Sequence, residues 1–144
     1  MLRTIVLVII AAAFGSGVAN AQQKVEIKGL SLKVKVNQAV SGYLSELNGK
    51  YQLRVTEFTL EPGGSVGPHH HAGPGILCIT AGEFTEGQAD GKTTIYKAGD
   101  CYYASGDLTH SARNATDKPL VFLSFEILPA SLSGGSIMPV PAPK

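Results

Sequence analysis

Residues 64–75 read GSVGPHHHAGPG, and the rest of the chain is best understood outward from this stretch. Side chains two positions apart on an extended strand point to the same face, so His69 and His71 are expected to lie together, with His70 turned away. Neutral imidazole is a common ligand of divalent transition metals, and His110 completes a set of three if its strand lies beside the first. The alternative is an exposed histidine-rich loop with adventitious metal affinity.

The remainder of the chain alternates between short apolar runs and turns. Its 144 residues include 17 Gly and 8 Pro, and many short strands separated by Gly/Pro turns are typical of an all-β sandwich or barrel. Residues 51–60 and 120–128 are the clearest strands, and their aromatic side chains, Phe125 among them, are expected in the core. The alternation slips near Glu57, which predicts a β-bulge there.

The charge balance argues against two classes of partner. Twelve Lys and Arg face eleven Asp and Glu, which gives a formal net charge of +1 with no run of like charge. Nucleic-acid binding and binding to anionic membranes therefore have no electrostatic footprint. A small-molecule ligand or substrate is the expected partner.

The N-terminal residues 1–21 have the layout of a secretory signal peptide. Arg3 precedes an apolar run over residues 4–14, and Ala19-Asn20-Ala21 is a small-residue cleavage site. We expect cleavage after Ala21 and a periplasmic or secreted mature protein that does not contact the membrane. The alternative is an uncleaved membrane anchor.

The mature chain is expected to hold one domain and a tail. Residues 22–130 are long enough for one folded domain and too short for two. Residues 131–144 are rich in Pro and Gly, which predicts an extended tail that is either loose or laid along an edge strand.

Two motifs within residues 60–127 resemble those of the cupin superfamily of small β-barrels. The first has a glycine, five residues and a His-x-His pair, with a glutamate and another glycine further on. Gly63, residues 69–71 and Gly82 occupy the glycine and histidine positions of that frame.

The second motif places a glycine five residues before a turn, which is followed by a histidine and then an asparagine. Gly99, the turn 105–107, His110 and Asn114 fit this frame. The resemblance implies a double-stranded β-helix, or jelly-roll barrel, in which three histidines converge on a metal. It also implies that Asn114 caps a turn, and that the protein is a homodimer by family analogy.

One departure from the first motif bears on the metal. Gly75 stands at the glutamate position, so the resemblance implies a site of His69, His71 and His110 without a carboxylate ligand. Losing this hard oxygen ligand favours Fe, Ni, Cu or Zn over Mn. Glu57 is a substitute carboxylate if its side chain turns inward.

Strand parity in this frame makes further predictions. Cys101 and Tyr103 are expected to face inward, which places Tyr103 near the metal as a catalytic donor to substrate or O₂; the alternative is an aromatic that only fills the barrel. Cys78 is expected to face outward, so no disulfide with Cys101 is predicted. Asp107 either orients His110 or stabilises the turn before it.

Two function classes follow. The first is an exported metal-dependent enzyme, with dioxygenase-type oxidation of a small organic molecule favoured over isomerisation or decarboxylation. The second is a non-catalytic periplasmic module that binds a metal or a small ligand. The missing motif glutamate and the nearly neutral net charge are compatible with both function classes, because one fold hosts many activities.

Overall fold

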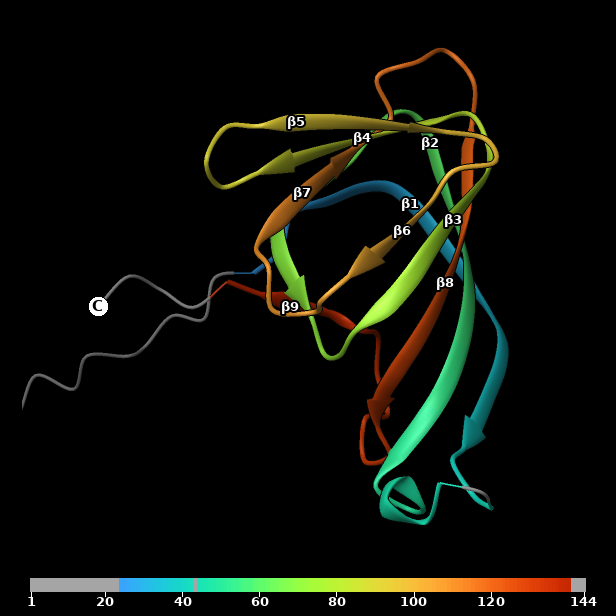
Figure 1. Ribbon diagram of the computed structural model, residues 1–144. Helices are drawn as coiled ribbons and strands as arrows, with labels where there is room; N and C mark the ends of the chain where they lie inside the picture. The colour runs from blue at the N-terminus through green and yellow to red at the C-terminus, as the bar shows by residue number, and fades with distance from the viewer. Residues whose placement is uncertain (1–23, 43, 141–144) are drawn as a thin grey trace, which may run out of the picture.

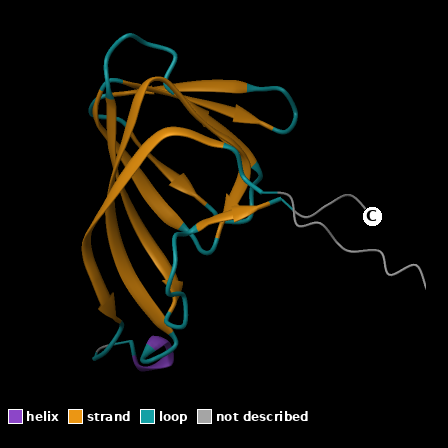
Figure 2. Ribbon diagram, turned by 180° about the vertical axis from the view of Figure 1, so that it is seen from behind, coloured by secondary structure: helices purple, strands orange, loops and turns teal. Residues whose placement is uncertain are grey.

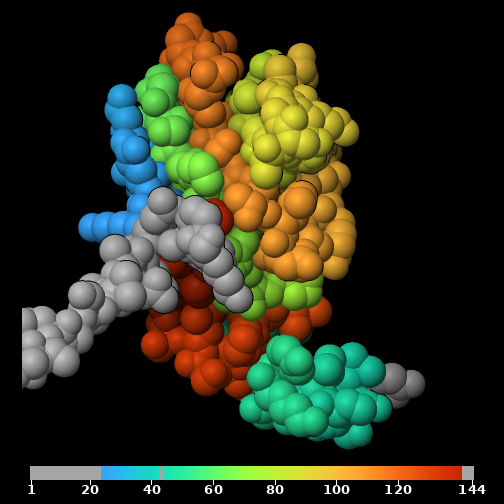
Figure 3. Space-filling view, turned by 90° about the vertical axis from the view of Figure 1, so that its left-hand side faces the viewer, coloured from blue at the N-terminus to red at the C-terminus, as the bar shows by residue number. Residues whose placement is uncertain are grey.

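The structure, a computed structural model, describes residues 24–42 and 44–140, so the predicted signal peptide lies outside the described residues. Nine strands form one antiparallel sheet that folds into a nearly closed barrel, which confirms the predicted jelly-roll class (Figure 1). The elements are β1 (Ile27–Ala39), the 3₁₀ turn η1 (Ser45–Leu47), β2 (Tyr51–His71), β3 (Gly75–Ala81), β4 (Glu83–Gln88), β5 (Thr93–Lys97), β6 (Cys101–Ala104), β7 (His110–Arg113), β8 (Leu120–Pro129) and β9 (Ile137–Pro139). The hairpin β4–β5 and the turn η1 project at opposite ends of the molecule (Figure 3).

Strand β2 connects the two walls of the barrel. Its first half, residues 51–60, pairs with β1 and β8, whereas residues 65–71 pair with β7, β9 and the first residues of β1. The corner between these halves is Pro62-Gly63-Gly64, where Gly63 has a φ of 69°, a backbone conformation that glycine adopts readily. This corner lets one strand carry the histidines from the first wall to the second.

The interior has two parts of different character. The core contains apolar side chains around and below the histidines, and they come from β2, β3, β4, β7 and β8: Phe58, Leu60, Val66, Leu77, Ile79, Phe84, Ala112, Leu120 and Phe122. Toward the other end of β2 and β8, the buried side chains are polar except for Leu128: Gln52, Arg54, Thr56, Ser124 and Glu126.

The predicted bulge at Glu57 is wrong. Residues 51–60 pair with β8 without a break, and the register shift lies in β1, between Val34 and Val36. The slip in apolar alternation instead marks the point where the inner face of β2 changes from apolar to polar. For the same reason Phe125, expected in the core, is 42% exposed on the outer face.

The prediction of unpaired cysteines is also wrong. Cys78 on β3 and Cys101 on β6 are direct cross-strand partners, with Cα atoms 4.1 Å apart, and they form a disulfide. The predicted inner and outer faces of β6 are exchanged in the structure: Cys101 and Tyr103 are exposed, while Tyr102 faces inward. Because side chains opposite each other on paired strands share a face, both sulfurs lie outside the barrel.

The described part of the predicted tail, residues 131–140, lies against the barrel. Within it, β9 pairs antiparallel with residues 69–71 of β2, which selects the edge-strand alternative for this portion (Figure 2). Asn114 is fully buried and donates to the carbonyls of Leu60 and Lys118, which confirms its turn-capping role. Among the described residues, no helix has the length and apolar character needed to cross a bilayer.

Candidate metal centre

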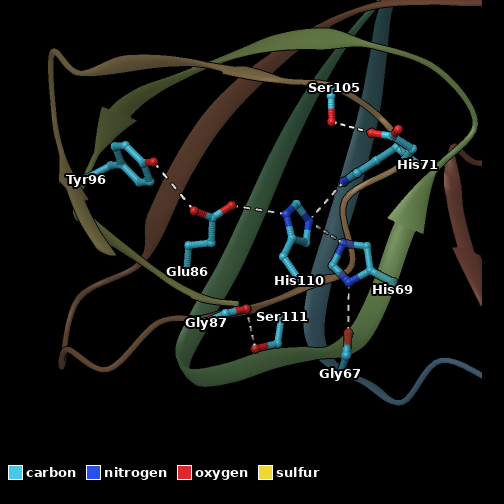
Figure 4. A network of polar contacts seen from close by, with 10 residues as sticks. Gly67, His69, His71, Glu86, Gly87, Tyr96, Ser105, His110 and Ser111 are labelled. Atoms are coloured by element: carbon cyan, nitrogen blue, oxygen red, sulfur yellow. Dashed lines mark hydrogen bonds and ion pairs between the residues drawn. The ribbon is translucent and has the colours of Figure 1, made fainter. Parts of the chain in front are cut away.

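The three predicted histidines converge on one point inside the barrel (Figure 4). The Nε2 atom of His110 lies 3.0 Å from that of His69 and 3.2 Å from that of His71. His69 and His110 are 2% and 5% exposed. The register brings them together, because His69 on β2 pairs directly with His110 on β7. His70 points away and does not belong to the cluster.

The opposite ring nitrogens, the Nδ1 atoms, each face an oxygen acceptor. His69 Nδ1 donates to the Gly67 carbonyl at 2.8 Å, and His110 Nδ1 lies 3.1 Å from Glu86 Oε1 (Figure 4). His71 Nδ1 lies 3.7 Å from Glu126 Oε1, too far for a hydrogen bond. A neutral imidazole that donates through Nδ1 keeps a lone pair on Nε2, which fixes the ligating atom.

This arrangement fits a divalent cation. Burial lowers the pKa of His69 to about 4 and that of His71 to about 3, so both rings are neutral at pH 7 and ready to coordinate. Nε2 lone pairs that face each other repel unless a proton or a metal ion lies between them. Metal–nitrogen bonds of about 2.0–2.1 Å place two nitrogens about 3 Å apart at octahedral angles and slightly further apart at tetrahedral angles, which is close to the observed spacing.

Comparison with known proteins identifies the family. The family model for the cupin domain matches residues 56–126, the segment that carries both histidine motifs. The chain belongs to the cupin superfamily. A comparison with curated proteins gives no match.

Solved cupin structures share this fold. A cupin domain from Bordetella pertussis Tohama I is 22% identical, with a TM-score of 0.52 over 71% of this chain and 96% of that one. A cupin-like protein from Thermotoga maritima MSB8 is 25% identical, with a TM-score of 0.54 over 67% of each chain. The polyketide cyclase RemF from Streptomyces resistomycificus is 17% identical, with a TM-score of 0.60 over 82% of this chain and 75% of that one.

In this cupin the space beside Gly75 is taken by a carboxylate from the neighbouring strand. Gly75 pairs with Glu126, and a Cβ atom added to Gly75 would lie 3.1 Å from Glu126 Cγ. Glu57, our suggested substitute, instead lies on the outer side and forms an ion pair with Lys35 at 2.9 Å. Glu126 therefore contacts the position of the missing motif residue, but it faces Nδ1 of His71 and is not in the ligand cluster, so it does not replace the missing ligand.

Two cavities flank the histidines. One, of about 30 Å³, is lined by all three histidines together with apolar side chains that include Phe58, Leu77 and Phe84. The other, of about 200 Å³, contacts only His71 and His110 of the three. Its remaining lining residues are Glu86, Gln88, Tyr96, Tyr102, Tyr103, Ala104, Ser105, Gly106 and Leu108.

The expectation that Tyr103 faces inward is wrong. Its side chain is 66% exposed at the rim of the larger cavity, because β6 has the opposite parity. Tyr102 is the inward tyrosine: it stacks on Tyr96 with ring centroids 4.1 Å apart, and its hydroxyl is buried without a hydrogen-bond partner among the described residues. Burial raises the pKa of Tyr102, so its phenol keeps its proton.

Sequence reasoning missed Glu86 and Glu126. Asp107, the suggested orienting residue, instead accepts a hydrogen bond from Ser105 within the turn. Glu86 was detectable, because it lies two positions after Phe84 on one strand and therefore shares the face of a core residue. Glu126 was not predicted to face inward, because the opposite face of β8 carries the more apolar side chains, as expected of an inner face.

Proposed function

We propose that this cupin is a metal-dependent enzyme that oxidises a small organic molecule with O₂, using His69, His71 and His110 as metal ligands. The convergence of three Nε2 atoms between two unlike cavities carries this proposal. The 30 Å³ cavity is mostly apolar and is large enough for a molecule the size of water, which suits O₂. The 200 Å³ cavity has room and polar groups for an organic substrate.

The ligand set favours Fe, Ni, Cu or Zn over Mn, because it offers only imidazole nitrogens. A redox-active ion, when bound, would let ground-state O₂ accept electrons from a closed-shell organic substrate. Zinc has no redox chemistry, so the proposed oxidation favours iron, nickel or copper within this group.

The surrounding residues have assignable roles. Glu86 holds His110 in the orientation that turns Nε2 inward, and the hydrogen bond with His110 lowers the pKa of Glu86, so it stays an anionic acceptor at neutral pH. Tyr102 offers a protonated hydroxyl to the substrate in the larger cavity. Tyr103 at the rim contacts the entering substrate.

Export to the periplasm or beyond is part of the proposal. The pattern of residues 1–21 supports it, and the Cys78–Cys101 disulfide is of the kind that persists in oxidising compartments. Mass spectrometry of the protein recovered from the periplasmic fraction should show a chain that begins at Gln22. An intact Met1 would contradict export by cleavage.

Metal analysis and oxygen consumption test the enzymatic proposal. The untagged protein should contain about one transition metal per chain, and His110→Ala should lose it while His70→Ala keeps it. The iron form should consume O₂ with at least one member of a panel of thiols, diketones and phenols. Metal retention without O₂ consumption across the panel would favour the non-catalytic binding module instead.

A matched tyrosine pair tests the assigned donor. Tyr102→Phe should lower the turnover rate by about 100-fold or more, in the range of a lost proton donor, whereas Tyr103→Phe should mainly change KM. The reverse result would return the catalytic role to Tyr103.

A further inference from the structure

A third cavity lies away from the histidines, between β1 and the segment that leads into β9. It is an open cleft of about 860 Å³, within the range of small-molecule sites. Figure 2 shows the chain after β8 running back along this side of the molecule to β9. The cleft is lined mainly by apolar side chains: Val25, Ile27, Leu30, Leu32, Val34, Phe58, Ile137 and Pro139.

The charges in this cleft have one sign. Lys24 and Arg54 are its charged lining residues, and no Asp or Glu lines it among the described residues. Its remaining polar lining comes from Asn37, Thr56 and residues 133–136. An apolar cleft with positive groups alone is complementary to an apolar molecule that carries a negative charge.

Arg54 is the stronger anchor. Its side chain is only 6% exposed, and its guanidinium donates to the carbonyls of Gly134 at 2.6 Å and Leu132 at 3.1 Å. Its Nε atom has no hydrogen-bond partner, and within residues 24–42 and 44–140 no carboxylate oxygen lies within 4.0 Å of its nitrogens. Arg54 does act on the buried carboxyl of Glu126, whose pKa is raised by burial and partly lowered by the charge of Arg54. Because burial disfavours the anionic form of Glu126 and the two groups form no ion pair, an anion bound beside Arg54 would still be favoured.

The cleft and the metal centre are distinct but share a wall. Leu30, Phe58 and Ile137 line both the cleft and the 30 Å³ cavity beside the histidines. None of the three histidines lines the cleft. A ligand in the cleft therefore need not contact the metal.

We infer that this cleft binds an apolar organic acid independently of the metal. The carboxylate lies against Arg54, within reach of the hydroxyls and backbone N–H groups of residues 133–136. The apolar body lies against Leu32 and Val34, which are 53% and 48% exposed. This site extends the proposed function and does not depend on it.

Titration of the metal-free full chain with two probes of equal length tests the inference. Octanoate should bind in calorimetry, and octanamide, which lacks the charge, should bind at least 10-fold more weakly. Arg54→Gln should reduce octanoate affinity to that of octanamide. Equal binding of both probes, or no binding of octanoate, would overturn the assignment.

Because Arg54 also holds residues 132–134, a second variant keeps the test independent of folding. Leu32→Trp fills the cleft from an exposed position and should weaken octanoate at least 10-fold, whereas His110→Ala should leave octanoate affinity unchanged. Loss of binding in His110→Ala would place the acid at the metal instead. Concentration-dependent dimers that octanoate does not dissociate would mean that a second copy covers the cleft, and would also overturn the inference.

Discussion

The two ends of the barrel interior are built from the same strands, yet they differ in polarity. Around the histidines, β2 and β8 turn Leu60, Leu120 and Phe122 inward. Toward the other end, the same two strands turn Arg54 and Glu126 inward and expose apolar side chains outside. The first end surrounds three imidazoles with apolar side chains. The second end places the guanidinium of Arg54 in the wall of the open cleft.

The polar end has a structural purpose as well. Gln52 donates to the carbonyls of Pro129 at 2.9 Å and Leu132 at 2.8 Å, and Arg54 donates to the same Leu132 carbonyl and to that of Gly134. These contacts hold the segment after β8 across the barrel end. Buried backbone oxygens need hydrogen-bond donors, and here the side chains of Gln52 and Arg54 supply the donors that a neighbouring strand would otherwise supply.

Equivalent substitutions at the two ends should show the largest contrast. Phe84→Ala removes a fully buried ring that contacts Phe122, and should lower the free energy of unfolding by about 3–5 kcal/mol. Phe125→Ala, on the outer face of the polar end, should change it by less than about 1 kcal/mol. Urea unfolding at constant pH measures both. A large cost for Phe125→Ala would show that another surface, such as the second copy of a homodimer, covers this face.

The disulfide should contribute the next largest effect. Cys78 and Cys101 are 23 residues apart, and a loop of this length corresponds to about 3 kcal/mol in the chain-entropy treatment. The Cys78→Ser/Cys101→Ser double variant should therefore unfold at lower urea than the wild type. The oxidised wild type should release no free thiol when denatured. Two free thiols would restore the prediction of unpaired cysteines.

Acid should destabilise the metal-free protein through the histidine end. The folded pKa values of His69 and His71, about 4 and about 3, lie below the ordinary 6.5. The contribution of these two neutral histidines to stability is fully present above pH 6.5. It is lost as the pH falls toward 4, because the unfolded chain then binds protons that the folded chain does not. The slope is about 1.4 kcal/mol per pH unit for each histidine.

The carboxyl of Glu126 at the polar end should affect the pH dependence of stability in the opposite direction. Burial raises its pKa, so between pH 4.5 and its higher folded value the folded state binds the extra proton. Glu126→Gln should therefore steepen the loss of stability on acidification, as measured by urea unfolding at several pH values. A pH-independent free energy of unfolding between 6.5 and 4.5 would contradict neutral histidines in the folded state.

The smallest effects should come from the two glutamates behind the histidines. Glu86→Gln should weaken metal binding by about 10-fold, the lower end of the range for residues that orient a ligand. Glu126→Gln should weaken it less, because its oxygen lies 3.7 Å from His71 Nδ1 rather than the 3.1 Å of the Glu86–His110 pair. Competition with a chromophoric chelator measures both. A larger effect of Glu126→Gln would mean that Glu126 moves onto His71 when metal binds.

The amino-acid sequence by itself determined the strands, their turns and the three histidines. Period-two alternation put His69 and His71 on one face, and the spacing of the second motif marked His110 as the third histidine of the set. These features are local, since they depend on residue type and separation along the chain.

The tertiary structure alone decided which face of each strand is inside and which residues meet across strands. Alternation predicts that residues 121, 123, 125 and 127 share a face, and it cannot say that this face is outside near Phe125. The inner face of β6 was likewise not determined by its sequence. The prediction therefore placed Tyr103 inside instead of Tyr102 and missed the disulfide. Burial and cross-strand partners depend on what packs against a face, and only the folded barrel supplies those neighbours.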